Sequence, residues 1–106
     1  MTKTDIVNYR GERCNLVPAR YNDNGNLALQ VMGEDGIPYC IASVNPGVAL
    51  PDEVIAVKDY SENKGMVDFL KGEGILGELY TIIPSGWVDI PVYYLTESGK
   101  ELFKGV

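Results

Sequence analysis

Residues 13–45 read RCNLVPARYNDNGNLALQVMGEDGIPYCIASVN and contain three strand-like stretches separated by two turn signals. The first signal contains Asn24-Gly25, which favours a tight hairpin turn because both residue types accept positive φ angles. The second is Glu34-Asp35-Gly36, another typical turn sequence. We therefore predict a three-stranded antiparallel meander, with strands at 13–21, 27–32 and 37–45.

In the middle strand of this meander apolar and other residues alternate. Leu27, Leu29 and Val31 fall on one face, and Ala28, Gln30 and Met32 fall on the other. Such a period of two residues is typical of a strand with one buried face. The alternation predicts that the first set faces the core.

Outside the meander the sequence predicts further strands and two helices. Ser61 is a suitable N-cap for a helix whose apolar stripe includes Met66 and Leu70, and Gly65 inside that helix would weaken it. Thr96 is a suitable cap for a short last helix over 97–103. Glycines at 72 and 74 end the first helix. The further strands are expected at 5–9, 53–58, 75–83 and 87–95.

The strand at 87–95 contains Pro91, which has no N–H to donate to a neighbouring strand. This predicts an edge strand, or a bulge at Pro91. With the hairpin that precedes it, the pattern predicts an α+β fold: a curved, mostly antiparallel sheet packed with one main helix. The length of 106 residues is that of a single domain, 1–106.

Composition places the chain among ordinary globular proteins, with 45% hydrophobic and 23% charged residues. No apolar run approaches the roughly 20 residues that a membrane-spanning helix needs. The first five residues, MTKTD, lack the apolar stretch of a secretory signal. We therefore expect a cytoplasmic protein that does not interact with membranes.

The net charge of −6 is unevenly distributed. Residues 1–21 carry +2, because they hold four basic and two acidic residues, whereas residues 22–99 carry −9, with twelve acidic and three basic residues. Nucleic acids bind clustered Lys and Arg, so direct nucleic-acid binding is not expected. The acidity fits a solvated surface, or a basic protein partner such as a nucleic-acid-handling protein.

Cys14 and Cys40 are too far apart for a CxxC motif and too few for a disulfide framework. A bridge between them remains open if the strands bring them together, but two free thiols fit the cytosol better. In predicted strands, both are expected to be small buried hydrophobes. No cofactor and no metal ion are expected.

The chain contains no histidine, so the commonest general acid–base and the commonest metal ligand are absent. We therefore do not expect an enzyme. The alternative, a small enzyme of unknown type, would have to use Lys58, Asp59, Tyr60 or Ser61, with Cys40 as an outside candidate.

Two regions are candidate binding surfaces. The first comprises Lys58, Asp59, Tyr60, Glu62 and Asn63, where polar side chains and a tyrosine lie between a strand and a helix. Capping explains Ser61 and Glu62, but not Tyr60 or Asn63. The second comprises Trp87 and Tyr93, which alternation places on one face of the last long strand. If this face points outward, it forms an interaction patch, since Trp and Tyr are enriched at interfaces.

Several segments resemble a domain-of-unknown-function family, number 4313. They are YRGERC (9–14), YNDNGNLALQ (21–30), EDGIPY (34–39), VKDYSEN (57–63) and PSGWVDIPV (84–92). The resemblance spans residues 5–96. It implies a small accessory protein of conjugative or phage-like elements of gut bacteria, with no assigned activity or catalytic residue.

Mobile elements use small acidic proteins to block host nucleases, so the resemblance suggests an inhibitor of anti-CRISPR or antirestriction type. The alternative is an accessory or structural module of a conjugation or replication apparatus, found as a homo-oligomer or bound to another protein of the element. The two hypotheses differ in partner: a host nuclease in the first, an element-encoded protein in the second.

Overall fold

The computed structural model describes residues 5–106, which form an α+β fold with two antiparallel sheets and two short α-helices. This confirms the predicted fold class. Neither helix within the described range has the length and apolarity needed to cross a membrane. In chain order the elements are β1 (Asp5–Tyr9), β2 (Glu12–Arg20), β3 (Leu27–Gly33), β4 (Pro38–Ile41), β5 (Val54–Ala56), a 3-10 turn η1 (Ser61–Asn63), α1 (Met66–Gly72), β6 (Leu76–Ser85), β7 (Val88–Leu95) and α2 (Glu97–Leu102).

The first sheet has the strand order β1-β2-β3-β4, and all neighbouring strands are antiparallel. It contains the predicted meander, with β1 added beside β2. The alternation predicted for β3 is confirmed, because Leu27, Leu29 and Val31 are buried against the core. Successive side chains of a strand point to opposite faces, so the remaining β3 side chains lie on the outer side of this sheet.

The turn between β2 and β3 is wider than the predicted tight hairpin turn. Gly25 has a positive φ of 76° as expected, but the Tyr21 N–H donates to the carbonyl of Asn26 at 2.9 Å, which closes a longer loop. The carboxamides of Asn24 and Asn26 donate to Asn45 Oδ1 at 3.0 and 3.4 Å. The longer turn therefore holds the loop after β4 against the sheet.

The second sheet has the order β5-β7-β6, so β7 is the central strand. The prediction that Pro91 marks an edge or a bulge is wrong, since the register shifts lie in β6, on either side of Leu79. The Pro91 carbonyl accepts a hydrogen bond from Val57 N–H at 3.0 Å, just beyond the last residue of β5. Proline is tolerated in this central strand because its partner strand ends there.

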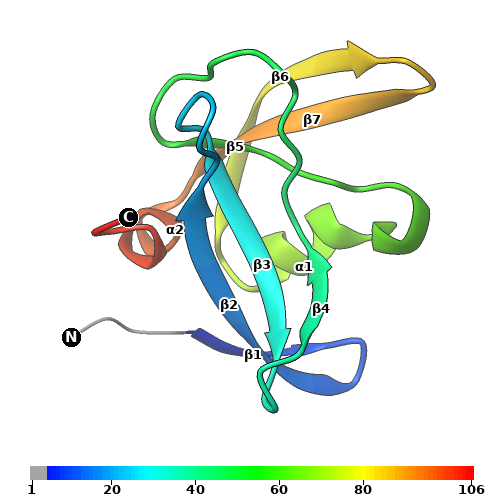
Figure 1. Cartoon of the computed structure of the whole chain (residues 1–106), viewed down its shortest axis with the longest axis vertical. Coiled ribbons are helices and arrows are strands. Elements are labelled where there is room, and N and C mark those ends of the chain that lie inside the picture. Colours follow the sequence, from blue (N-terminus) through cyan, green and yellow to red (C-terminus); the bar gives the residue numbers. More distant parts are fainter. Residues whose placement is uncertain (1–4) are drawn as a thin grey trace.

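The two sheets meet where the chain after β4 runs beside β5. Ser43 and Val57 form an isolated antiparallel bridge, and Lys58 N–H donates to the Ala42 carbonyl at 2.8 Å. The predicted strand at 37–45 is therefore divided: β4 ends at Ile41, and the next residues pair with the other sheet. Figure 1 shows the first sheet in the lower half of the molecule and the β6–β7 hairpin projecting at the upper right.

The helix α1 begins later than predicted. Ser61 is not its N-cap, because residues 61–63 form the separate 3-10 turn η1. Gly65 occupies the N-cap position with a φ of 95°, a conformation that glycine adopts without steric cost. Gly65 therefore lies before the helix and does not weaken its interior. The end of α1 at Gly72 agrees with the prediction.

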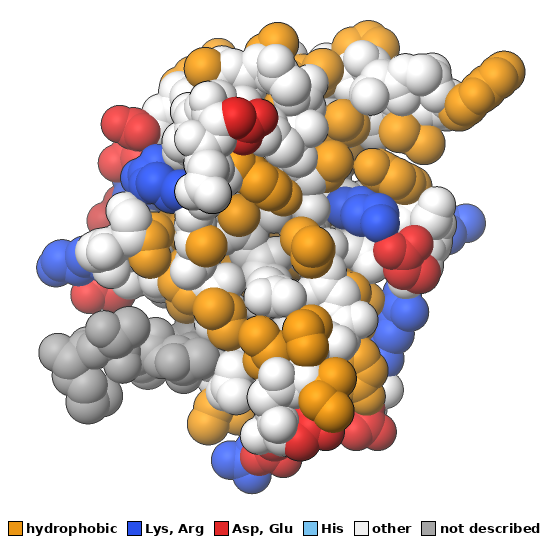
Figure 2. Space-filling view, in the orientation of Figure 1, with side chains coloured by type: hydrophobic (Ala, Val, Ile, Leu, Met, Phe, Trp, Pro, Cys, Tyr) orange, Lys and Arg blue, Asp and Glu red, His pale blue; other side chains and the backbone are white. Residues whose placement is uncertain are grey.

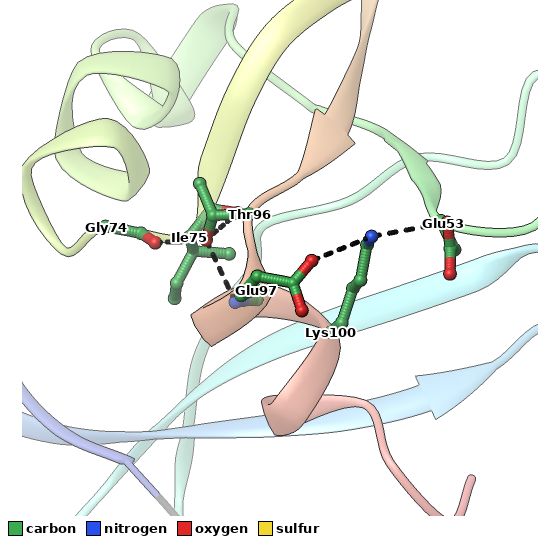
Figure 3. Close-up of polar contacts among 7 residues, drawn as sticks. Glu53, Gly74, Ile75, Thr96, Glu97 and Lys100 are labelled. Atoms are coloured by element: carbon green, nitrogen blue, oxygen red, sulfur yellow. Dashed lines mark hydrogen bonds and ion pairs between the residues drawn. The ribbon is translucent and has the colours of Figure 1, made fainter.

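Thr96 caps α2 as predicted. Its hydroxyl oxygen accepts a hydrogen bond from Gly99 N–H at 3.0 Å and its hydroxyl donates to the carbonyl of Gly74. Lys100 Nζ lies 3.1 Å from a carboxylate oxygen of Glu97 and 3.4 Å from one of Glu53 (Figure 3). These contacts fasten α2 to the chain before β6 and to the residue before β5.

The main core lies between the two sheets and the helices, and includes Leu16 and Leu29 from the first sheet, Ile55 from the second and Leu70 from α1. A smaller cluster lies on the opposite face of the second sheet. It consists of Val54, Ala56, Ile90 and Val92, against which Val44 and Leu50 of the loop after β4 pack. The second sheet is thus buried on both faces near β5.

Candidate protein-interaction site

The predicted segment 58–63 lies where the chain leaves β5 and turns towards α1. Lys58 Nζ lies 2.7 Å from Glu62 Oε2 and 5.7 Å from the centre of the Tyr60 ring. The hydrogen bond between the Lys58 and Glu62 side chains raises the pKa of Lys58 and lowers the pKa of Glu62. These two charges already compensate each other within the protein.

Asp59 has a structural role in this segment. Its Oδ1 accepts hydrogen bonds from Gly65 N–H and from Val67 N–H, both at 3.0 Å. The first N–H groups of a helix have no partner inside it, and a carboxylate in this position satisfies them. Asp59 is therefore the side chain that caps α1, the role predicted for Ser61.

Asn63 is fully buried, with 0% of its surface exposed. Its Nδ2 donates to the Ile41 carbonyl at 2.6 Å, whereas Oδ1 has no hydrogen-bond partner within the described part of the chain. The bond ties the segment to the end of β4. Asn63 is therefore inaccessible to a partner protein in this structure.

Arg10, which was not among the predicted site residues, also holds this segment. It lies in the turn between β1 and β2 with a φ of 53°, and its Nη2 donates to the carbonyls of Glu62 (2.6 Å) and Lys64 (3.2 Å). The one sequence feature that could have drawn attention to Arg10 is its position directly before Gly11 in a turn. The contact joins two segments that are 52 residues apart, a pairing that the sequence pattern does not indicate.

Trp87 has the opposite environment. It lies in the turn between β6 and β7 and its exposed fraction is 104%, so it makes essentially no contact that shields it from water. Figure 2 shows a hydrophobic side chain protruding at the tip of this hairpin, beyond the rest of the molecule. A tryptophan side chain buries roughly 150–250 Å² when it is covered. Its full exposure therefore leaves a large apolar area without a partner in the monomer.

Four other large apolar side chains are exposed on the same hairpin. Tyr80 and Tyr94 pack edge to face with ring centres 5.3 Å apart, which holds both rings at the surface. Neither was a predicted site residue: Tyr80 lies on β6 and Tyr94 on the central strand β7, and the strand pattern does not show that their side chains are left uncovered. We call the five residues the hairpin surface: Leu79, Tyr80, Ile82, Trp87 and Tyr94.

Tyr93 does not join Trp87 in this surface. It packs against the main core, and Lys71 Nζ lies 5.0 Å from the centre of its ring. Trp87 precedes Val88, the first residue of β7, and so lies outside the alternation that would place it on the Tyr93 face. Of the predicted binding residues, Trp87 is the one that the structure leaves fully exposed.

The segment that forms the hairpin carries charge of one sign, and Lys71, just before it in the chain, lies over the Tyr93 ring of β7. Residues 72–99 contain no lysine or arginine and four carboxylates, at Glu73, Glu78, Asp89 and Glu97. Glu78 and Asp89 are exposed on the two strands of the hairpin. An exposed apolar anchor flanked by carboxylates is complementary to a basic partner.

The chain has few groups suited to covalent chemistry. Both thiols are free, and burial raises the pKa of Cys14 and the pKa of Cys40, which disfavours the reactive thiolate. Among the side chains of residues 6–106, no group of three His, Cys, Asp or Glu is arranged to hold a metal ion. A polar hollow of about 370 Å³ at the β3–β4 turn is lined by Arg13 and Glu34, which pair with each other at 3.3 Å and remain exposed. The hairpin surface is therefore the better-supported site.

Comparisons with protein-family models, with curated proteins and with solved structures found no match for this chain.

Proposed function

We propose that this protein is a non-enzymatic binding protein that inhibits a basic nucleic-acid-handling protein. The single observation that supports this most strongly is Trp87, which is 104% exposed at the tip of a projecting hairpin. Interface hot spots are enriched in Trp, Tyr and Arg, and a few such residues supply most of the binding energy. In this proposal Trp87 inserts into a pocket of the partner, and the remaining hairpin surface packs around it.

The class of partner follows from charge. The four carboxylates and the lack of basic residues over 72–99 favour a positively charged surface, such as the channel through which a nuclease binds DNA. The resemblance to a family of mobile-element proteins adds a biological direction. We propose a host defence nuclease of CRISPR or restriction type as the preferred target.

The test is a DNA-cleavage assay with a purified CRISPR nuclease and a purified restriction endonuclease, each titrated with this protein. Stoichiometric inhibition that weakens as salt rises is expected, because salt screens exposed charges. Trp87→Ala should raise the inhibitory concentration at least about 30-fold, the equivalent of a hot spot of about 2 kcal/mol.

Ile37→Ala is the matched control, since Ile37 is an exposed apolar residue in the β3–β4 turn, outside the hairpin surface. Its inhibitory concentration should equal that of the unmodified protein. Equal inhibition by Trp87→Ala would remove the hairpin surface from the proposal. If neither nuclease is inhibited, the proposed target class is wrong.

A further inference from the structure

The first sheet has an outer face that nothing in the described part of the chain covers. Strand register sets Asn15 beside Met32, and Gln30 between Val17 and Ile41, all on the side away from the core. Ala28 lies on the same side, two residues before Gln30 in β3. We call these six residues the outer face. The core-facing residues of the same strands, such as Leu16 and Val31, are fully buried.

This outer face has the wrong composition for a surface that meets only water. An antiparallel sheet with one solvated face normally carries polar and charged residues on that face. Four of the six residues here are apolar and none is charged. In Figure 2 hydrophobic and uncharged side chains cover the region over β2, β3 and β4, and charged side chains lie around its rim. A shallow hollow of about 150 Å³ lies within it, lined by Val17, Ala28, Gln30 and Ile41 among others.

We propose that the outer face is the contact between two copies of this chain, which form a symmetric homodimer. Each copy carries a net charge of −6, so two copies repel each other wherever carboxylates would meet. The six residues of the outer face avoid this cost because none is charged; Arg13, two residues before Asn15 on the same side of β2, is 61% exposed and pairs with Glu34 at the rim. The hairpin surface is less suitable for self-association, since Glu78 and Asp89 of both copies would approach one another.

The two polar residues of the outer face also favour a second copy. The side chains of Gln30 and Asn15, both half-buried, make no hydrogen bond to the side chains or backbone described over residues 6–106. A carboxamide offers both donors and an acceptor, so it can pair with the same group of an identical chain across a two-fold axis. Gln30 lies at the centre of the face, between Val17 and Ile41, where such an axis would pass.

The size of the outer face is sufficient for the centre of a dimer contact. Strands lie about 4.8 Å apart and alternate residues about 6.7 Å apart, so the patch covers roughly 20 by 20 Å with its side chains. A standard interface buries about 800 Å² per partner, with an apolar centre and a polar rim. An interface of about 800 Å² would cover about one eighth of the 6271 Å² of surface that one chain exposes.

Sedimentation velocity from about 5 to about 200 µM tests the proposal directly. The unmodified protein should shift from monomer to dimer over this range. Ile41→Arg should raise the dissociation constant at least about tenfold, because it places a positive charge in the apolar centre. Ile82→Arg is the matched control, since Ile82 is 50% exposed and Ile41 51%, and it should dimerise normally.

Gln30→Glu provides a second variant, which sets two carboxylates close to the two-fold axis. The dimer should be weaker at pH 7 and should form again at a pH low enough to protonate the glutamate.

A monomer of the unmodified protein at every concentration would overturn the proposal. So would a dimer that survives both Ile41→Arg and Gln30→Glu, and loss of the dimer in Ile82→Arg alone would assign self-association to the hairpin. These outcomes are independent of nuclease inhibition, so they separate this proposal from the proposed function.

Discussion

The turn over 58–65 and the hairpin β6–β7 both lie at the surface, but their side chains have opposite environments. In the turn, Asp59 and Asn63 bond to backbone groups of the protein itself. In the hairpin, Trp87 touches almost nothing. Polar side chains can therefore serve the fold itself, whereas an apolar side chain without contacts is available to a partner. The difference predicts that substitutions in the turn change stability and that those in the hairpin change binding.

The largest expected effect in the turn is that of Asn63→Asp. The carboxylate would replace the amide donor that bonds the Ile41 carbonyl, at a position with 0% exposure. We expect the free energy of unfolding at pH 7 to fall by about 3 kcal/mol, as for an unpaired buried charge. Urea unfolding followed by circular dichroism measures it. Asn22→Asp, in an exposed turn, should change stability by less than about 0.5 kcal/mol; equal losses in both variants would contradict the structural role of Asn63.

A smaller effect is expected for Asp59→Ala. Removing the carboxylate leaves the N–H groups of Gly65 and Val67 without their acceptor, which should cost about 1–2 kcal/mol of the free energy of unfolding. Asp59→Asn retains Oδ1 and should lose less than half as much in the same urea measurement. Asp68→Ala, an exposed acid in the first turn of α1, is the control. A loss at Asp68 as large as at Asp59 would show that general helix electrostatics, rather than capping, is responsible.

The smallest effect on stability is expected for Trp87→Ala, which removes the largest side chain of the hairpin surface. Because Trp87 is 104% exposed, the free energy of unfolding should change by less than about 0.5 kcal/mol. Thermal and urea unfolding should agree on this value. A loss above about 1 kcal/mol would mean that Trp87 packs against the protein in solution, and the contrast between the two regions would disappear.

Features that depend on local spacing were predictable from the sequence. The structure confirms the alternation in β3 and the Thr96 cap of α2. Both were predictable because each involves residues only a few positions apart. The cap of α1 was not predictable in this way. Asp59 reaches the helix from six residues before Gly65, across a 3-10 turn, so the usual rule of a capping residue at the helix start selects Ser61 instead.

Sheet order explains the other differences between prediction and structure. Pro91 does lack a ladder donor, but it is tolerated in the central strand β7 because β5, only three residues long, ends beside it. Trp87 was predicted from its residue type and from alternation within the expected strand 87–95, although the structure places it in the turn before β7. The exposure of Tyr80 on β6 and of Tyr94 on β7 depends on how the hairpin packs against distant segments, which the strand pattern does not indicate. Arg10 needed the contact between its turn and the segment 58–65.

The environment of Trp87 also decides what an optical experiment on this protein can detect. Trp87 is the only tryptophan among the 106 residues, and it is already surrounded by water in the folded state. Its fluorescence should therefore hardly change when the chain unfolds. Burial of the indole in a partner's pocket should shift the emission to shorter wavelength. The intrinsic fluorescence of this protein should thus report association while remaining nearly silent about folding.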